Sequence, residues 1–380
     1  MNDFKNALNK KIKQSIKNNY GIENYDEYRF GSYPTNSNNK NAWELLSLKN
    51  LKKVIKKIIG HHPENKQYFK SANELVDKHL TNINKIWANI SKTDQVLYVS
   101  LIAYMILGYK KVKLPRNNSE YWKAIEITKS LSNPNDTYDP KFMHFILKKF
   151  DLNPVGFNIK LYFSELGIAI DYIIEQYAYK LENKNIVSVE KGDTVLDIGG
   201  CWGDTALYFA HQAGENGKVY SFEFIPGNIK LFNINKAFNP DLINKIELIE
   251  QPVSDKSGDS IYFKDFGPGS KVEFEPFEGQ TGTCKTISID DFVKSKNIQN
   301  IDFIKMDIEG SETAALNGAL ETIKKFRPKL AIAIYHSMND FVNIPTWILD
   351  LDLDYEIFIG HYTIHAEETV CFAKPKIKNS

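Results

Sequence analysis

The pattern of apolar and polar residues changes near Gly192. Beyond this point, short apolar runs rich in β-branched residues alternate with stretches of helical periodicity, which predicts alternating strands and helices. The predicted strands are Thr194–Ile198, Val219–Glu223, Ile246–Glu250, Asp302–Met306 and Lys329–Tyr335, with a closing pair at Asp354–Gly360 and Thr369–Ala373. The predicted helices are Asp204–Ala213, Pro226–Phe238 and Glu312–Phe326. Such alternation is typical of a mostly parallel α/β sheet.

The first part of the chain lacks this alternation and is predicted to be helical. Asn2–Asn19 carries apolar residues at four-residue spacing, which predicts an amphipathic helix. Further helices are predicted at Lys92–Tyr109, Tyr121–Leu131, Phe142–Phe150 and Tyr162–Leu181. We therefore expect a helical accessory domain over residues 1–158, through which the protein could oligomerise, and an α/β domain over residues 159–376.

Charge gives little indication of a polyanionic partner. The chain of 380 residues has a formal net charge of +1. A predicted helix at Ala42–Ile59 is rich in lysine but has no interleaved aromatic residues, so a solvated helix face is favoured over an anion-binding or lipid-binding patch. We expect no nucleic-acid partner.

The apolar segments and the cysteines indicate the cellular compartment in which the protein is expected. The most apolar run, Val96–Gly108, is too short to cross a bilayer, and the lysine-rich first residues do not resemble a signal peptide. The three cysteines form no CxxC pair, which fits a reducing compartment. These features predict a cytoplasmic protein without a transmembrane segment.

The first chemical motif is GDTVLDIGGCWGD, from Gly192 to Asp204. A buried strand ends near Asp197, glycines at 199, 200 and 203 allow a tight turn, and a helix begins at Asp204 and Thr205. A strand, a glycine turn and a helix N-terminus together predict a nucleotide-type site.

The spacing of this motif bears on the ligand. The dinucleotide fingerprint GxGxxG fails because Ile198 replaces its first glycine, which argues against a nicotinamide-dependent oxidoreductase. Asp197 would repel a pyrophosphate but suits a cation, such as the ammonium or sulfonium group of S-adenosylmethionine. Glu223 ends the next strand about 20 residues after Gly203, where an acid can bind ribose hydroxyls.

A second group of polar residues follows later strands. The sequence IDFIKMDIEGSE places Asp307 and Glu309 after a buried strand, and Glu312 begins a helix. Glu312 has a competing explanation, since an acid in the first turn complements the helix dipole. His336 follows the next strand, and His361, His365, Glu367 and Glu368 lie near the end of the chain. A histidine with carboxylates can act as a general base or hold a divalent metal, and the sequence leaves the metal undecided.

Several segments together resemble the FkbM family of S-adenosylmethionine-dependent methyltransferases. They are VLDIGGCWGDTALYFA, FEFIPGN and FIKMDIEGSE followed by ALNGALETIKKFRPKLAI, within Gly192–Lys374. YHSMND, IPTWI and ETVCFA are similar to a subgroup of that family. One departure is Gly200-Cys201-Trp202, where the family commonly has Ala-Asn and an aliphatic residue.

The resemblance implies a class I methyltransferase fold, a Rossmann-like, mostly parallel seven-stranded sheet whose last strand is reversed. It also implies O-methylation of a sugar, glycoconjugate or natural-product hydroxyl. By motif, Asp197, Gly199 and Gly203 would bind the methionine part. Gly200, Asp204 and Thr205 are further residues expected to bind the cofactor. Glu223 would bind the ribose, Phe224 with Pro252 and Val253 the adenine, and Asp307 would face the cofactor amine and methyl.

The chemistry expected of such an enzyme is in-line displacement at the sulfonium methyl. A hydroxyl acceptor must lose its proton, and Asp307, Glu309 and His336 are the predicted catalytic residues, acting directly or through a metal. The alternative is a non-catalytic protein that binds S-adenosylmethionine or a nucleotide, or docks a partner.

Overall fold

In the computed structural model, the described residues are 3–34, 68–70 and 74–376. They divide into two compact units. The first, here called the N-terminal unit, spans Met1–Asn117 with Ile364–Ala366, and the second, the sheet unit, spans Asn118–Thr363 with Glu367–Ser380. The predicted lysine-rich helix at 42–59 lies outside the described residues. The domain boundary at residue 158 stays a prediction.

The N-terminal unit is helical in its described part. Its elements are α1 (Asp3–Ser15), η1 (Gly21–Asn24), α2 (Glu27–Phe30), α5 (Leu80–Asn89) and α6 (Lys92–Leu107). Phe4, Leu8 and Ile12 of α1 are buried, and α1 packs against α6. Ser91 accepts a hydrogen bond from the Asp94 amide at the start of α6 (3.1 Å), and Gly108 ends this helix with φ 74°. The helices predicted at 2–19 and 92–109 are thereby confirmed.

The sheet unit begins with α7 (Ser119–Leu131) and a small antiparallel sheet of β1 (Ser132–Tyr138), β2 (Leu147–Asp151) and β3 (Lys160–Phe163). The helix predicted at Phe142–Phe150 is wrong, because its first residues form a bend and a turn and β2 takes up the rest. A short, mainly apolar segment such as this one fits either the helical or the strand period, and pairing of β2 with both β1 and β3 decides in favour of a strand.

The long helix predicted at Tyr162–Leu181 is also wrong. Its place is taken by the end of β3, α8 (Glu165–Ile168), the π-helical segment η4 (Ala169–Ile174) and the hairpin of β4 (Tyr179–Leu181) and β5 (Lys184–Val187). Glu175 has φ 60° and ends η4, while Glu182 and Asn183 form the hairpin turn with φ 49° and 62°. Left-handed residues at these points interrupt an apolar pattern that looks continuous in the sequence.

The main sheet has seven strands in the order β14-β15-β13-β12-β6-β7-β8. Their bounds are β6 (Thr194–Ile198), β7 (Lys218–Phe222), β8 (Ile246–Ile249), β12 (Phe303–Met306), β13 (Lys329–Ala333), β14 (Tyr355–His361) and β15 (Thr369–Pro375). Only β15 pairs antiparallel, with both β13 and β14. This arrangement confirms the predicted mostly parallel seven-stranded sheet with its last strand reversed.

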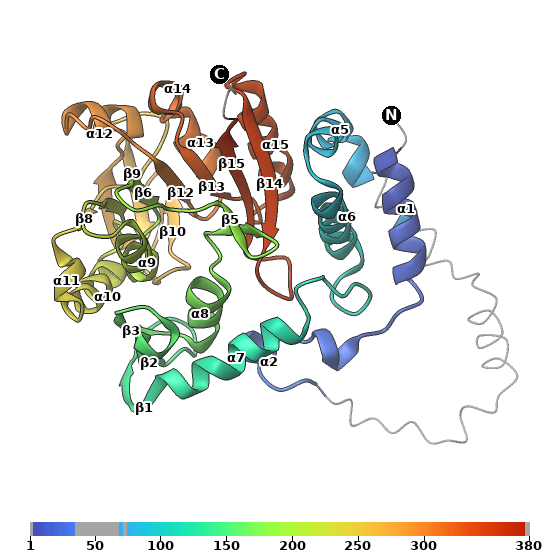
Figure 1. The fold of residues 1–380 in the computed structure, drawn as a ribbon, viewed down its shortest axis with the longest axis horizontal. Helices are drawn as coiled ribbons and strands as arrows, with labels where there is room; N and C mark the ends of the chain where they lie inside the picture. The colour runs from blue at the N-terminus through green and yellow to red at the C-terminus, as the bar shows by residue number, and fades with distance from the viewer. Residues whose placement is uncertain (1–2, 35–67, 71–73, 377–380) are drawn as a thin grey trace, which may run out of the picture. The chain divides into compact units, whose positions relative to one another are not determined.

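Helices cover both faces of this sheet, as Figure 1 shows. The helices α9 (Asp204–Ala213), α10 (Pro226–Ala237) and α11 (Pro240–Ile243) lie on one side, below the sheet in that view. The helices α12 (Ile289–Ser295), α13 (Glu312–Asn317) and α14 (Leu320–Phe326) lie on the other, and α15 (Met338–Asp350) packs on β14 and β15. The predicted helix 312–326 is thus divided into α13 and α14.

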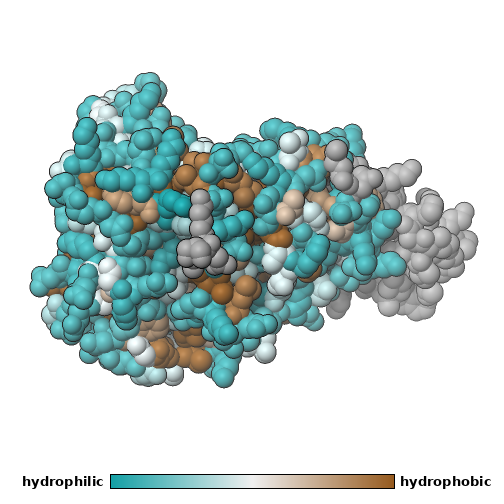
Figure 2. All heavy atoms as spheres, turned by 45° about the horizontal axis from the view of Figure 1, so that its top comes forward, coloured by the Kyte–Doolittle hydropathy of each residue, from teal (hydrophilic) through white to brown (hydrophobic). Residues whose placement is uncertain are grey.

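The Gly- and Pro-rich stretch between β8 and α12 forms a second small antiparallel sheet of β9 (Ser260–Lys264), β10 (Lys271–Glu273) and β11 (Gly282–Lys285). The centre of the main sheet is apolar, with Ile198, Phe303 and Ile332 fully buried. In the part of the chain that the structure describes, no helix is long and apolar enough to cross a membrane. The face drawn in Figure 2 is mainly hydrophilic, with smaller apolar areas between.

Candidate active site

The glycine turn follows β6 and packs tightly against neighbouring strand ends. A Cβ atom on Gly199 would lie 2.0 Å from the Asp307 carbonyl oxygen, and one on Gly200 would lie 2.1 Å from Ser221 Oγ. The amides of Gly199 and Gly200 both donate to the Phe222 carbonyl oxygen, at 3.1 and 2.8 Å. Gly203 has φ 84° and precedes α9. Glycine is therefore required here by close packing within the fold itself.

Asp197 is fully buried, and its partners come from within the domain. Its carboxylate accepts hydrogen bonds from Thr205 Oγ1 (3.0 and 3.1 Å) and Ser221 Oγ (2.7 Å), and it pairs with Lys305 Nζ at 3.2 Å. Ser221 and Lys305 are its register partners on β7 and β12, so both neighbouring strands place these groups beside it. Asp197 thereby holds the turn in place, and its contact with a cofactor stays a prediction.

Lys305 is a charged residue at the centre of the sheet, with only 2% of its side chain exposed. Its ammonium group also donates to the Gly199 carbonyl oxygen (2.6 Å) and lies 5.4 Å from the centre of the Tyr177 ring. Burial alone would lower the pKa of Lys305, but the carboxylates of Asp197 and Asp307 outweigh it and raise the pKa. Lys305 therefore stays positively charged and links the glycine turn to the end of β12.

Glu223, at the end of β7, is turned back onto its own loop. Its Oε1 accepts from the amides of Phe224 (2.7 Å) and Ile225 (2.8 Å), and its Oε2 accepts from Asn228 Nδ2 (3.1 Å). Asn228 in turn accepts from Trp202 Nε1 at 3.0 Å, so Trp202 is fixed in a buried position. Burial raises the pKa of Glu223 to about 7 against these hydrogen bonds. Its expected role at the ribose stays a prediction.

The residues expected at the adenine lie on the loops after β7 and β8. The Phe224 ring contacts the Phe263 ring edge-to-face at 5.7 Å between centres. Pro252 and Val253 are buried, and the Pro252 carbonyl oxygen accepts from the Ile287 amide at 2.9 Å. These two loops adjoin the glycine turn through β7, so an adenine contact stays a reasonable prediction for all three residues.

Two further acids lie beside the glycine turn. Asp204 begins α9, and among the described residues its Oδ1 is buried without a hydrogen-bond partner. Asp171, on η4, is buried, and its carboxyl group interacts with that of Asp204. Burial raises the pKa of Asp204 to about 6, and burial and the Asp204 charge raise that of Asp171. Asp171 was not predicted from the sequence, although an acid within the apolar run GIAIDYII was a signal.

Asp307 collects hydrogen bonds at the end of β12. It accepts from Tyr177 Oη (3.0 Å), from Tyr335 Oη (3.1 and 3.2 Å) and from His336 Nε2 (3.1 Å). Burial favours the neutral carboxyl, but the hydrogen bond from His336 and the charge of Lys305 outweigh it and lower the pKa of Asp307. Neither tyrosine was among the predicted site residues. Tyr335 could have been found as the last residue of a predicted strand.

His336 contacts three carboxylates. Its Nε2 lies 3.1 Å from Asp307 Oδ1 and 3.2 Å from Glu312 Oε1, and its Nδ1 lies 3.6 Å from Glu309 Oε2. Burial would lower the pKa of His336, but Asp307 and Glu312 raise it to about 11. The structure thus brings together all three predicted catalytic residues, Asp307, Glu309 and His336, with Glu312. These four are called the acid–imidazole cluster below.

The members of this cluster differ in burial. The Glu309 side chain is 66% exposed, whereas that of Glu312 is 0% exposed. Glu312 Oε1 accepts from the Ile308 amide at 2.7 Å, and among the described residues its Oε2 is buried without a partner. Only Glu309 therefore offers an open carboxylate.

The histidines near the end of the chain have other partners. His361 lies in β14, and its Nδ1 contacts Thr369 Oγ1 at 3.0 Å. His365 belongs to the N-terminal unit, where its Nδ1 contacts Tyr104 Oη at 2.7 Å. Glu368 instead accepts from Gln176 Nε2 at 2.6 Å within the sheet unit.

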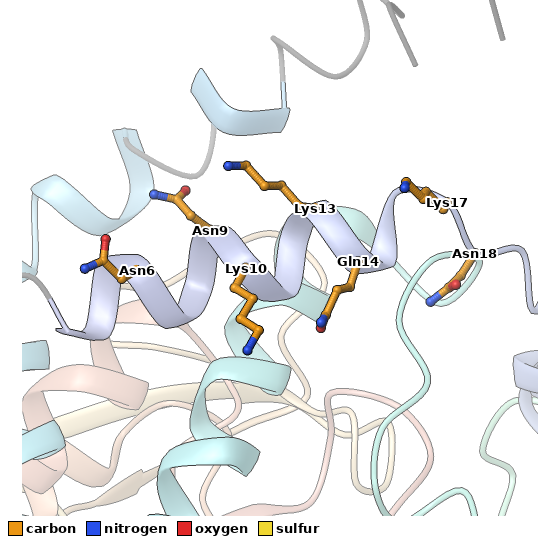
Figure 3. Close-up of a pocket in the computed structure, with 7 residues that line it drawn as sticks. All are labelled: Asn6, Asn9, Lys10, Lys13, Gln14, Lys17 and Asn18. Atoms are coloured by element: carbon orange, nitrogen blue, oxygen red, sulfur yellow. The ribbon is translucent and has the colours of Figure 1, made fainter. Parts of the chain in front are cut away.

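A hollow of about 630 Å³ lies along α1 in the N-terminal unit. It is lined by the side chains drawn in Figure 3, namely Asn6, Asn9, Lys10, Lys13, Gln14, Lys17 and Asn18. These are amides and lysines from a single helix and the turn after it, and they include none of the predicted site residues. The predicted site residues that the structure describes lie in the sheet unit instead.

Comparisons with known proteins bear on this domain. Residues 188–357 match the family model of the methyltransferase FkbM domain. Among curated proteins, no match to this sequence is found.

Solved structures of low sequence identity are also similar. They include a methyltransferase FkbM from Methylobacillus flagellatus KT, with 16% identity, a TM-score of 0.49 and coverage of 78% of this chain and 59% of that one. A fibrillarin from Aeropyrum pernix, solved with natively bound S-adenosyl-L-methionine, has 11% identity, a TM-score of 0.32 and coverage of 64% and 98%. An S-adenosylmethionine-dependent O-methyltransferase from Thermotoga maritima has 14% identity, a TM-score of 0.30 and coverage of 50% and 62%. This chain thus spans 59% of the length of the first.

The matched range contains the glycine turn, Glu223 and the whole acid–imidazole cluster. Over these residues, the match confirms the family expected from the motifs. Residues 188–357 of this chain are a methyltransferase domain of the FkbM family.

Proposed function

We propose that this protein transfers the methyl group of S-adenosylmethionine to a hydroxyl oxygen of a sugar, glycoconjugate or natural product in the cytoplasm. One observation carries the proposal: within an FkbM domain, the buried acids near Lys305 outnumber the cationic groups that they contact. Asp171, Asp197, Asp204 and Asp307 are all near Lys305, and of these four only Asp307 also contacts His336, so the acids outnumber the two cationic groups. A ligand that carries an ammonium and a sulfonium group suits this surplus of negative charge.

The oxygen of Asp204 that lacks a partner is the best candidate for the cofactor ammonium group. It lies at the start of α9, directly after the glycine turn, and Asp171 supports it from η4. An ammonium group that donates to this oxygen would satisfy a buried acceptor. The methionine part would then lie over Gly199, Gly200 and Gly203, with Thr205 and Asp197 fixing the turn beneath it. Glu223, Phe224, Pro252 and Val253 would bind the ribose and adenine.

The reaction is an in-line displacement. The acceptor oxygen forms a bond to the methyl carbon while the bond from carbon to sulfur breaks, which leaves S-adenosylhomocysteine. Holding the acceptor oxygen opposite the sulfur supplies much of the rate. The hydroxyl proton must pass to a base.

Geometry favours Glu309 as that base. Asp307 already accepts from two tyrosines and His336, and both ring nitrogens of His336 face carboxylates. Glu309 has the most exposed carboxylate of the cluster, and it approaches His336 only to 3.6 Å. In this assignment, Asp307 and His336 position Glu309, and Glu309 accepts the acceptor's proton.

The N-terminal helical part is proposed to be an accessory domain that selects the acceptor or forms an oligomer. Its helices carry none of the predicted site residues.

Calorimetry of the full chain with S-adenosylmethionine, S-adenosylhomocysteine and NAD⁺ tests the proposal first. We expect one methionine-cofactor site per chain and no NAD⁺ site. A panel of sugars, glycoconjugates and phenols is then assayed for release of S-adenosylhomocysteine. Binding without turnover of any acceptor would favour the non-catalytic alternative, and tighter binding of NAD⁺ would overturn the proposal.

A further inference from the structure

Three side chains of the acid–imidazole cluster are spaced for a metal ion. Asp307, Glu312 and His336 each offer one ligand atom, and these atoms lie within 4.8 Å of one another. They come from three separate elements, the ends of β12 and β13 and the start of α13. One imidazole nitrogen and two carboxylate oxygens are a donor set that divalent transition metals accept.

A second, independent observation points to a ligand at this place. Glu312 is 0% exposed, and its Oε2 is buried without a hydrogen-bond partner among the described residues. The position of Glu312 in the first turn of α13 accounts for the hydrogen bond that Oε1 accepts from the Ile308 amide, but not for the burial of Oε2. The other oxygen belongs to the same carboxylate that contacts His336, so it borders the cluster. A buried carboxylate oxygen left without a donor is costly, and a cation would remove that cost.

The charges of the cluster agree with this. Three carboxylates, those of Asp307, Glu309 and Glu312, approach one imidazole. As a ligand, His336 would release its Nε2 proton, so a bound cation would replace the positive charge of the imidazolium. A divalent cation would balance the two buried carboxylates and leave Glu309 at the exposed side.

The groups around Asp307 are also of the kind that orient a carboxylate for metal binding. The hydroxyl groups of Tyr177, before β4, and Tyr335, after β13, both donate to the Asp307 carboxylate and so fix its orientation. Hydrogen bonds of this kind orient metal-binding carboxylates in known sites. The Lys305 ammonium group is paired with Asp197 and donates to the Gly199 carbonyl oxygen, so its direct partners lie outside the cluster.

We propose that Asp307, Glu312 and His336 form a binding site for a divalent cation such as Mn²⁺ or Mg²⁺, with Tyr177 and Tyr335 orienting Asp307. The role of the cation, though not its binding, rests on the proposed function. Bound there, it would attract the acceptor's hydroxyl oxygen and ease loss of the proton to Glu309.

Binding of Mn²⁺ to the full chain, freed of metal by a chelator, tests the proposal. Electron paramagnetic resonance reports free Mn²⁺, and we expect one bound ion per chain in the absence of S-adenosylmethionine. Glu312→Gln keeps the shape of the side chain and should weaken Mn²⁺ binding at least tenfold. Glu356→Gln makes the same change on the exposed edge of β14 and should leave binding unchanged. Equal Mn²⁺ affinity in the two variants, or no binding by the unchanged protein, would overturn the proposal.

A measurement on the unchanged protein covers the case in which Glu312→Gln fails to fold. A cation that binds only the folded chain raises Tm, so Tm should increase with Mn²⁺ concentration and saturate. A Tm that does not respond to Mn²⁺ contradicts the site. The proposed function has its own readout, since S-adenosylmethionine binding is measured by calorimetry without metal. Failure of one can therefore be told from failure of the other.

Discussion

The glycine turn and the acid–imidazole cluster lie at the same edge of the sheet, but their acids are used differently. Asp197 and Glu223 accept hydrogen bonds from their own and adjacent loops, and Asp197 also pairs with Lys305. In the cluster, Glu312 keeps a buried oxygen without a partner among the described residues, and Glu309 is open. Position at a strand end therefore does not by itself define a ligand contact. The acceptor capacity that the fold leaves unused is the better guide.

The largest effect is expected from breaking the cluster at Glu309. Glu309→Gln removes the proposed base and should lower turnover about 100- to 10,000-fold. Because Glu309 is not proposed to contact the cofactor, affinity for S-adenosylmethionine should stay within about twofold. Turnover is followed by release of S-adenosylhomocysteine and affinity by calorimetry. Glu356→Gln serves as the control, and unchanged turnover in Glu309→Gln would assign the base elsewhere.

On the glycine-turn side, the strongest effect should be on stability. Lys305→Met leaves the buried Asp197 without its charged partner and should destabilise the fold by about 3–5 kcal/mol. Urea unfolding measures this loss. The double variant Asp197→Asn with Lys305→Met removes both charges and should recover part of it. If the two single changes simply add, the pair does not act as a unit.

A smaller effect distinguishes which acid near the turn binds the cofactor. Asp204→Asn removes the charge of the carboxylate whose Oδ1 is buried without a partner among the described residues, and should weaken S-adenosylmethionine binding about 10- to 100-fold. The fold should not be destabilised, since the variant also removes a buried charge. Asp241→Asn, on the surface at α11, is the matched control. Equal calorimetric affinity in both variants would place the ammonium group elsewhere.

The pH dependence of stability tests whether Glu223 is a structural acid. Its pKa is raised from 4.5 to about 7 in the folded chain, so between these values the folded chain binds more protons than the unfolded chain. Its contribution to stability is therefore present below about pH 4.5 and is lost as pH rises to about 7, by at most about 1.4 kcal/mol for each pH unit in this range. Glu223→Gln should lack this decline in urea unfolding measured from pH 5 to 8. The same decline in both proteins would assign it to another group.

Much of the fold and the site was predictable from the sequence. The strands ending near Asp197, Glu223 and Asp307 are short and apolar, and parallel pairing brings their ends to one edge. His336 was predicted from the same reasoning. For these residues, position along the chain determines position in space because the sheet is regular.

The site residues and strands that could not be predicted depend on irregular backbone or on pairing between segments that are distant in the sequence. Asp171 and Tyr177 lie in a segment predicted as one helix, and only the π-helical turn and the left-handed Glu175 direct them to the site. Lys305 had a visible signal, a charged residue within an apolar strand, but its pairing with Asp197 follows from strand register. Strand β1 has almost no apolar residues, and it forms because β2 offers a partner.

The most direct test of the central claim is calorimetric titration of the unchanged full chain with S-adenosylmethionine. We predict one site per chain, with an affinity at least tenfold higher than for NAD⁺, because buried acids around Lys305 leave negative charge that this donor can balance. Absence of S-adenosylmethionine binding by a chain that unfolds cooperatively would contradict the claim.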